Sequence, residues 1–177
     1  TRSDSRSWIR DGAMSAEGLL RLGRPEVVKE YVEYYAPYQF ENGKVPCCVD
    51  DRGSDPVPEN DSHGELIFNI AEYYRYTGDK AFLKKMWPHV QGAFAYMEAL
   101  RLSERTEANR AVNAAFYGMM PASISHEGYS AKPMHSYWDN FWALRGYKDA
   151  VEVAEALGKA AAAKRMAASR DQFREDL

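Results

Sequence analysis

Apolar residues recur at intervals of three and four positions in six stretches of the chain, which predicts six helices. The clearest pattern lies in the fourth stretch, at Phe82, Leu83, Met86, Trp87, Val90, Phe94 and Met97. The stretches form three pairs: 13–22 with 25–36, 61–76 with 80–100, and 137–151 with 159–175. The pattern therefore predicts an all-α protein built from three helical hairpins.

Turn and capping residues support these boundaries. Gly23 and Pro25 separate the first two helices, as expected where one helix ends and the next begins. Asp79 and Ser136 precede helical stretches and are good N-caps. Pro88 lies within the fourth stretch, and we expect it to kink that helix or end its first part, because proline has no N–H to donate.

Long connections separate the pairs, whereas the turns within each pair are short. The connections cover about 37–60 and 102–135 and are punctuated by Gly and Pro. In a toroid of inner and outer helices, each would arrive at the N-terminus of an inner helix on the same end. We therefore predict a single domain over residues 1–177 that forms part of a toroid. A plain bundle or helical repeat is the alternative, but no fixed sequence period supports a repeat.

The two ends of the sequence indicate a segment of a larger protein. Trp8 and Ile9 follow the first residue closely, with no room for an earlier element, and the last helical pattern continues to Leu177. We expect the complete protein to continue the same architecture.

Charge and hydropathy narrow the classes of partner. The formal net charge is −3, from 23 Lys and Arg against 26 Asp and Glu, and the signs are mixed along the chain. A nucleic-acid partner is disfavoured, because nucleic-acid binders gather their cations into a dominant patch. No apolar stretch reaches the roughly 18 residues of a membrane span, and residues 1–10 contain no apolar signal region. We expect a soluble, cytoplasmic protein that binds no membrane.

The two cysteines favour neither a disulfide nor a cofactor. Cys47 and Cys48 are neighbours, which strains a mutual disulfide. Two thiols alone do not complete a usual structural zinc site. The prediction is therefore no metal and no other cofactor.

Polar and aromatic residues gather at three helix starts, in segments 7–12, 58–63 and 135–140. Each segment offers a carboxylate, and the mixture suits sugars, whose hydroxyl groups take paired hydrogen bonds and whose C–H faces pack on aromatic rings. The alternative is that the carboxylates only favour helix starts and that the Trp side chains belong to the core. The candidate substrate-binding residues are Trp8, Arg10, Asp11, Glu59, Asn60, Asp61, His63, Tyr137 and Trp138.

Ordered motifs over nearly the whole chain resemble the six-hairpin glycosidase superfamily, which includes glucoamylase-like, trehalase-like and rhamnosidase-like enzymes. The motifs lie in segments 7–13, 60–79, 123–130 and 136–142. The resemblance implies that the three hairpins form about half of an (α/α)6 toroid. It also implies that Arg10 and Asp11, in a Trp-x-Arg-Asp context, bind the sugar where cleavage occurs.

The resemblance further implies a general acid. In trehalase-like and processing-glucosidase-like members the acid lies in a Trp-Asp or Met-Asp segment opening an inner helix, and Asp139 matches that segment. Those families usually have Gly before the aromatic residue, where this sequence has Tyr137. Glu127, in the preceding loop, therefore stays a rival to Asp139.

The resulting prediction is a fragment of a glycoside hydrolase that works by inversion, with one carboxyl as acid and a second carboxylate activating water. The second carboxylate would come from later hairpins, so the isolated monomer is expected to be inactive, and a homodimer is expected to cover the open helix faces. Alternatives are a noncatalytic carbohydrate-binding or structural helical module, and a scaffold for protein partners.

Overall fold

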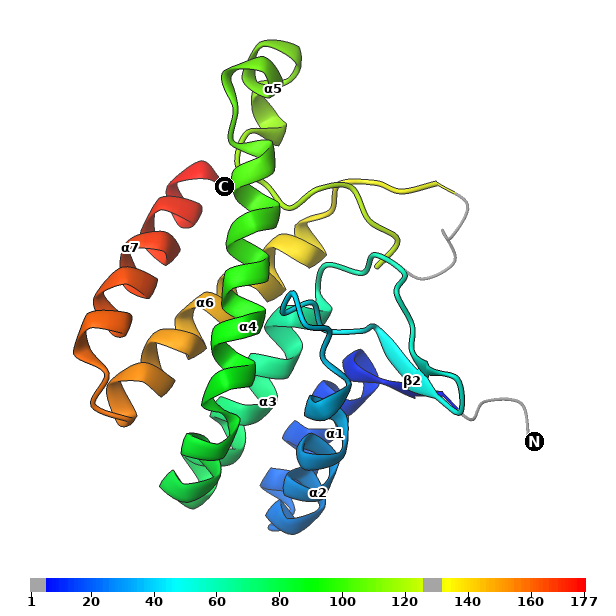
Figure 1. Cartoon of the computed structure of the whole chain (residues 1–177), viewed down its shortest axis with the longest axis vertical. Helices are drawn as coiled ribbons and strands as arrows, with labels where there is room; N and C mark the ends of the chain where they lie inside the picture. The colour runs from blue at the N-terminus through cyan, green and yellow to red at the C-terminus, as the bar shows by residue number, and fades with distance from the viewer. Residues whose placement is uncertain (1–5, 126–131) are drawn as a thin grey trace.

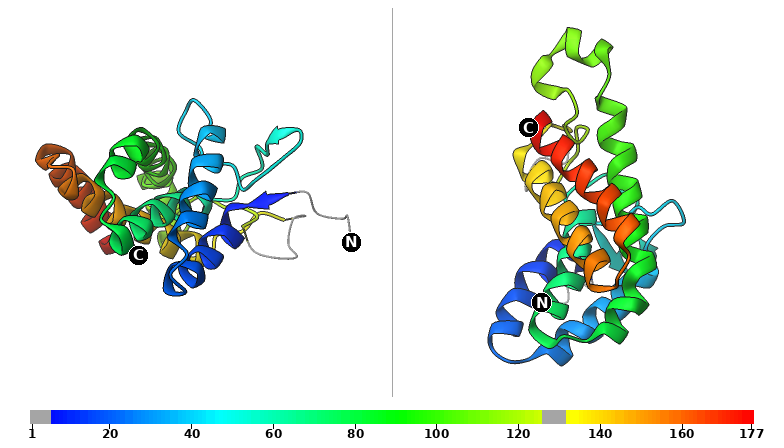
Figure 2. Two further views of the ribbon diagram at one scale, coloured as in Figure 1. Left: turned by 90° about the horizontal axis from the view of Figure 1, so that it is seen from below. Right: turned by 90° about the vertical axis from the view of Figure 1, so that its left-hand side faces the viewer.

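Three antiparallel helical hairpins make up the computed structural model, which describes residues 6–125 and 132–177 (Figure 1). α3 lies between α1 and α6 in one row, and α2, α4 and α7 pack behind them in a second row (Figure 2). The hairpins are α1 (Ile9–Arg21) with α2 (Pro25–Tyr35), α3 (Ser62–Thr77) with α4 (Lys80–Glu104), and α6 (Tyr137–Ala156) with α7 (Ala160–Asp176). The three hairpins predicted from the apolar pattern are therefore confirmed.

The expected caps are present. Gly78 adopts a left-handed φ of 66°, and the Asp79 side chain accepts a hydrogen bond from the Phe82 N–H at 2.9 Å. Ser136 Oγ accepts from the Asp139 N–H at 3.2 Å at the start of α6. Pro88 does not end a helix, since α4 runs through it as one element. Burial of the α4 apolar stripe against α3 compensates for the backbone hydrogen bond that proline cannot make.

The two long connections contain short elements that the sequence pattern did not predict. The first holds η1 (Ala36–Tyr38), β2 (Cys48–Asp50) and β3 (Gly53–Ser54), and the second holds α5 (Glu107–Val112) and η2 (Ala114–Phe116). β1 (Ser7–Trp8) pairs with β2, and β2 with β3, in an antiparallel sheet. This small sheet fixes the start of α1 against the segment that leads to α3.

The α3–α6 contact is unusually close because glycines face each other. A side chain on Gly64 would overlap the carbonyl oxygen of Trp142, and one on Gly146 would meet the Cα of Gly64. The absence of side chains at these positions lets the two backbones approach. The starts of α3 and α6 are thereby held next to each other.

Gly64→Ala should destabilise the protein by roughly 1–3 kcal/mol, because the added methyl group has no space and the helices must separate. The matched control is Gly18→Ala, at an exposed position of α1 where an added Cβ meets nothing within 4 Å. The control should stabilise by roughly 0.5–1 kcal/mol through helix propensity alone. Chemical denaturation of both variants measures the difference, and equal stabilities would contradict the close contact.

One apolar core runs between the two helix rows. Its largest fully buried members include Tyr35, Leu66, Leu83, Met97 and Tyr147. In the part of the chain that the structure describes, none of the helices is long and apolar enough to cross a membrane.

Candidate functional site

Arg10, in the first turn of α1, is the centre of the candidate site. Its Nε donates to Asp61 Oδ2 at 2.8 Å, and its Nη2 donates to Glu59 Oε2 at 2.5 Å. The same Nη2 donates to the carbonyl oxygen of Ser125 at 2.6 Å. Charge-assisted bonds of this kind fix orientation as well as distance. One guanidinium group thus joins α1 to both long connections.

Asp61 brings the third helix start into the same cluster. It is fully buried, and its Oδ2 also accepts a hydrogen bond from Trp138 Nε1 at 2.7 Å. Trp138 lies in the first turn of α6 and is 38% exposed. The residues entering α1, α3 and α6 therefore meet at one place, although they are far apart in the sequence.

Asp139 is connected to this cluster through two serines. Ser123 Oγ donates to Asp139 Oδ2 at 2.6 Å and lies 2.7 Å from Ser125 Oγ. Asp139 is fully buried, and its Oδ1 has no hydrogen-bond partner among the described residues. Burial raises the pKa of Asp139 to about 6, against the opposing effect of the two serine hydroxyls. The carboxyl is therefore partly protonated near neutral pH.

Burial also raises the pKa of two neighbouring carboxyl groups. The pKa of Glu59 is raised even though Arg10 lowers it. The pKa of Glu65, one turn after Asp61, is raised well above its ordinary value by burial and by the nearby Asp61 carboxylate. Within the described residues, three buried oxygens have no hydrogen-bond partner: Asp61 Oδ1 and the two carboxyl oxygens of Glu65. A neutral Glu65 can donate to Asp61, which would satisfy two of these buried atoms.

A cleft of about 980 Å³ opens beside the cluster, between α1, α2 and the small sheet. Trp8, Arg10, Asp11 and Glu59 line it. The Arg6 guanidinium lies over the Trp8 ring, 5.9 Å from its centroid. An aromatic ring, a guanidinium and carboxylates around one opening can bind the hydroxyl groups and the C–H face of a sugar.

Five of the predicted binding residues do not line the cleft: Asn60, Asp61, His63, Tyr137 and Trp138. Two of these, Asn60 and His63, are buried and bonded to the connections. Asn60 is buried, with its backbone N–H donating to Ser125 Oγ at 2.8 Å and its side chain donating to the Pro121 carbonyl at 2.9 Å. His63 is fully buried, and its Nδ1 accepts from the Val45 N–H at 3.1 Å. Burial lowers the pKa of His63 to about 3, so its ring is neutral. Asn60 and His63 therefore hold the connections in place.

The remaining predicted residues differ in accessibility. Asp11 is exposed at the cleft. Tyr137 is 61% exposed and stacks on Phe141, with ring centroids 5.5 Å apart. Glu127 lies outside the described residues.

Ser123, Ser125 and Glu65 belong to the site but were not among the predicted residues. The serines lie within the 123–130 motif, so their sequence carried a signal, but not their link to Asp139. Glu65 follows Asp61 by four residues, a spacing that places both on one helix face. Neither pattern alone distinguishes a site residue from a capping or surface residue.

The stability of the protein should depend on pH through Asp139. Its folded pKa of about 6 lies above the ordinary value of about 4, so the folded state binds more protons between these values. The stabilisation that comes from Asp139 is then fully present below pH 4, and this contribution of roughly 3 kcal/mol is lost as pH rises through 6. The Asp139→Asn variant should lack this decline. Denaturation of both proteins at several pH values measures it, and parallel curves would contradict the shift.

Comparison with known proteins gives a family for this arrangement. Residues 3–127 match a family model described as amylo-alpha-1,6-glucosidase. The chain belongs to the amylo-alpha-1,6-glucosidase family. The matched span contains Arg10, Glu59, Asp61 and both serines, and stops before Trp138 and Asp139. The resemblance to six-hairpin glycosidases is confirmed at the level of the superfamily, and the chain is a glycosidase-related domain.

A solved structure agrees with the family. This member of the amylo-alpha-1,6-glucosidase family is similar to the GH78 family rhamnosidase of Bacillus sp. GL1. The TM-score is 0.70 and the sequence identity is 17%. The match covers 97% of this chain and 17% of the rhamnosidase chain. It shows that the three hairpins have the fold of part of a helical toroid. No curated protein sequence matches the chain.

Proposed function

We propose that this chain provides one wall of the carbohydrate site of a glycoside hydrolase, and that the complete toroid cleaves an α-1,6-linked glucoside. The joining of Arg10, Glu59, Asp61 and Trp138 beside an open cleft carries this proposal. The family description supplies the linkage to test first. Arg10 and Glu59 would bind sugar hydroxyl groups, and Trp8 would pack on a ring face.

Asp139 is the proposed general acid. An acid must hold its proton near the working pH, and burial gives Asp139 a pKa of about 6. Its Oδ1 is buried and has no hydrogen-bond partner among the described residues, so the proposed role requires that a bound sugar gain access to this atom. With inversion, the second carboxylate would lie about 6.5–9.5 Å from Asp139 and would come from another part of the complete toroid.

Glu59 and Glu127 are rivals of Asp139 for the role of acid, and access to the cleft favours Glu59. Asp139 is enclosed by the described residues, whereas Glu59 lines the cleft and also has a raised pKa. The variants Asp139→Asn, Glu59→Gln and Glu127→Gln separate the three. The acid variant should lose turnover of natural glycosides but retain much of it with an aryl glycoside, whose leaving group needs no proton.

Two substrate types test the reaction. Oligosaccharides with a terminal α-1,6-linked glucose should be hydrolysed by the intact protein, and aryl α-L-rhamnosides should not. NMR of the first product formed should show β-glucose, as inversion requires. Cleavage of the rhamnoside alone, or first release of α-glucose, would contradict the proposal.

A noncatalytic carbohydrate-binding module is the second candidate, and the full burial of Asp139 favours it. Calorimetry would then show sugar binding without turnover in the intact protein.

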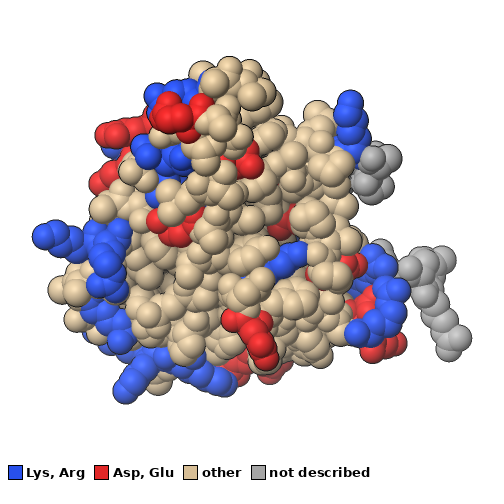
Figure 3. All heavy atoms as spheres, turned by 45° about the horizontal axis from the view of Figure 1, so that its top comes forward, with Lys and Arg blue, Asp and Glu red and all other residues tan. Residues whose placement is uncertain are grey.

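The homodimer also stays a prediction. Figure 3 shows Lys and Arg side chains along the left edge, over α7, and Arg145, Lys148, Arg170 and Arg174 line a groove there. Pairing two such edges would bring like charges together, so we expect a dimer to use the α1–α2 edge. Light scattering that shows a monomer at micromolar concentration would contradict the dimer.

A further inference from the structure

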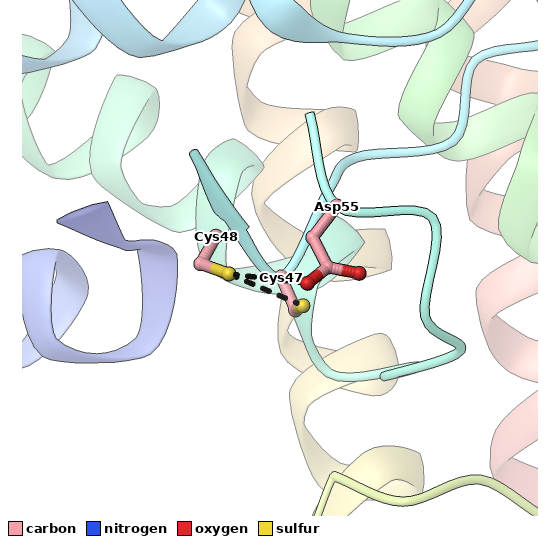
Figure 4. A group of neighbouring side chains, drawn as sticks. All are labelled: Cys47, Cys48 and Asp55. Carbon is pink, nitrogen blue, oxygen red and sulfur yellow. Dashed lines mark hydrogen bonds between the residues drawn. The ribbon is translucent and has the colours of Figure 1, made fainter. Parts of the chain in front are cut away.

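A cluster of potential metal ligands lies at the edge of the small sheet. Cys47 Sγ and Cys48 Sγ are 3.9 Å apart, and Cys48 Sγ is 3.8 Å from Asp55 Oδ2. Figure 4 shows the two sulfur atoms and the Asp55 carboxylate close together. Potential ligand atoms of all three residues lie within 4.8 Å of one another. The sequence contains only two thiols, and the fold adds a carboxylate as a third ligand.

The backbone holds these three residues in place. Cys48 lies in β2, and the Asp55 N–H, just after β3, donates to the Cys48 carbonyl at 3.0 Å. The Cys47 carbonyl accepts from the Ile9 N–H at 3.0 Å. Asp55 Oδ1 accepts from the Val57 N–H at 3.0 Å, which turns Oδ2 toward the thiols. Little rearrangement is needed to bring the ligand atoms around one ion.

The spacing matches tetrahedral coordination. With Zn–S bonds of about 2.3 Å and Zn–O bonds of about 2.0 Å, two sulfurs on one ion lie about 3.8 Å apart and a sulfur and an oxygen about 3.5 Å apart. The observed separations of 3.9 Å between the sulfurs and 3.8 Å between Cys48 Sγ and Asp55 Oδ2 are close to these values, and the third pair, Cys47 with Asp55, lies within 4.8 Å. Adjacent thiols that are too far apart for a bond to each other are thus well placed to share a cation.

We propose that Cys47, Cys48 and Asp55 form a binding site for a thiophilic divalent cation such as Zn²⁺, with the fourth position open to the cleft. Both Cys47 and Asp55 line that cleft. On binding, the two thiols release their protons to solvent and the ion gains two thiolates and one carboxylate. The proposal does not depend on sugar hydrolysis.

Arg6 balances the charge of the occupied site. Two thiolates and a carboxylate around a divalent ion carry one net negative charge. The Arg6 guanidinium lies 4.0 Å from Asp55 Oδ2 and is 35% exposed, so it can shift and still stay close. A nearby cation compensates part of the excess negative charge.

Cobalt binding to the reduced, metal-free protein tests the proposal. Co²⁺ should bind with one ion per chain and give a thiolate-to-cobalt charge-transfer band, which Zn²⁺ should remove by displacement. Cys48→Ser leaves one thiolate ligand and should weaken both the binding and the band. Loss of an outer hydrogen-bond partner typically weakens metal binding by about 10–100-fold, so loss of the Asp55 ligand in Asp55→Asn should weaken it by at least about 10-fold.

Asp51→Asn is the matched control, since Asp51 is exposed and lies in the same β2–β3 turn. It should bind Co²⁺ like the wild type. As a second measurement, Zn²⁺ should raise the Tm of the wild type and of Asp51→Asn but much less that of Asp55→Asn. Binding without a charge-transfer band, binding unchanged in Cys48→Ser, or no binding at micromolar Co²⁺ would each overturn the proposal.

Discussion

Asp139→Asn should lower the kcat of the intact protein on α-1,6-linked glucosides by about 10²–10⁴-fold while leaving sugar affinity nearly unchanged. The amide keeps the size of the carboxyl group and can still bond Ser123, but it has no proton to transfer. Asp139 is buried and bonds Ser123, with no direct bond to Arg10 or Glu59 among the described residues, so its replacement should leave the groups that line the cleft in place. Steady-state kinetics and calorimetry measure the two effects separately.

Ser123→Ala is the control for this prediction. The Ser123 hydroxyl lowers the pKa of Asp139, so its removal should raise that pKa further. A general acid loses activity as pH rises through its pKa, and the alkaline limb of the rate profile should therefore move to higher pH. Wild-type turnover by Asp139→Asn, or loss of turnover on natural glycosides with retained turnover on aryl glycosides in Glu59→Gln, would remove Asp139 from the role of acid.

Arg10→Met should destabilise the protein by about 3–5 kcal/mol and abolish sugar binding. Its guanidinium is only 17% exposed and pairs with Glu59 and Asp61, whose side chains are 8% and 0% exposed. Without it, two buried carboxyl groups lose their cation, and the connections before α3 and α6 lose a shared donor. Denaturation and calorimetry measure both losses.

The matched control is Arg21→Met, at the other end of α1, where the Arg21–Glu17 pair is exposed. It should change neither stability nor sugar binding by a measurable amount. The loss of stability in Arg10→Met should become smaller as pH falls through the raised pKa of Glu59, because a neutral carboxyl group needs no cation. Equal stability of the two variants would show that the Arg10 cluster does not hold the helix starts together.

The apolar pattern was sufficient to predict the hairpins because each helix buries one regular stripe. The start of α1 was placed too late, at residue 13, because Ile9 is separated by three polar or small residues from Ala13, and both are buried on one face. The small sheet was missed because strands of two or three residues show no alternation. Pro88 did not end α4, since packing of Met86 and Val90 outweighs one missing backbone bond.

The site was only partly predictable. Arg10, Asp61 and Trp138 lie in three separate sequence clusters, and the alternation of short turns and long connections was enough to place them at one end. Their direct hydrogen bonds depend on the close α3–α6 contact at Gly64, which helical periodicity does not reveal. His63 was expected to bind substrate, yet it is fully buried. Burial at a helix start is set by the neighbouring connection, not by the helix itself.

The most direct test of the carbohydrate site is a crystal structure of the protein with a bound α-1,6-linked glucosyl oligosaccharide. We expect a glucose unit in the cleft between α1, α2 and the small sheet, with hydroxyl groups at about 2.7–3.2 Å from Arg10 and Glu59. A sugar bound elsewhere, with the cleft beside Arg10 empty, would contradict the proposed site.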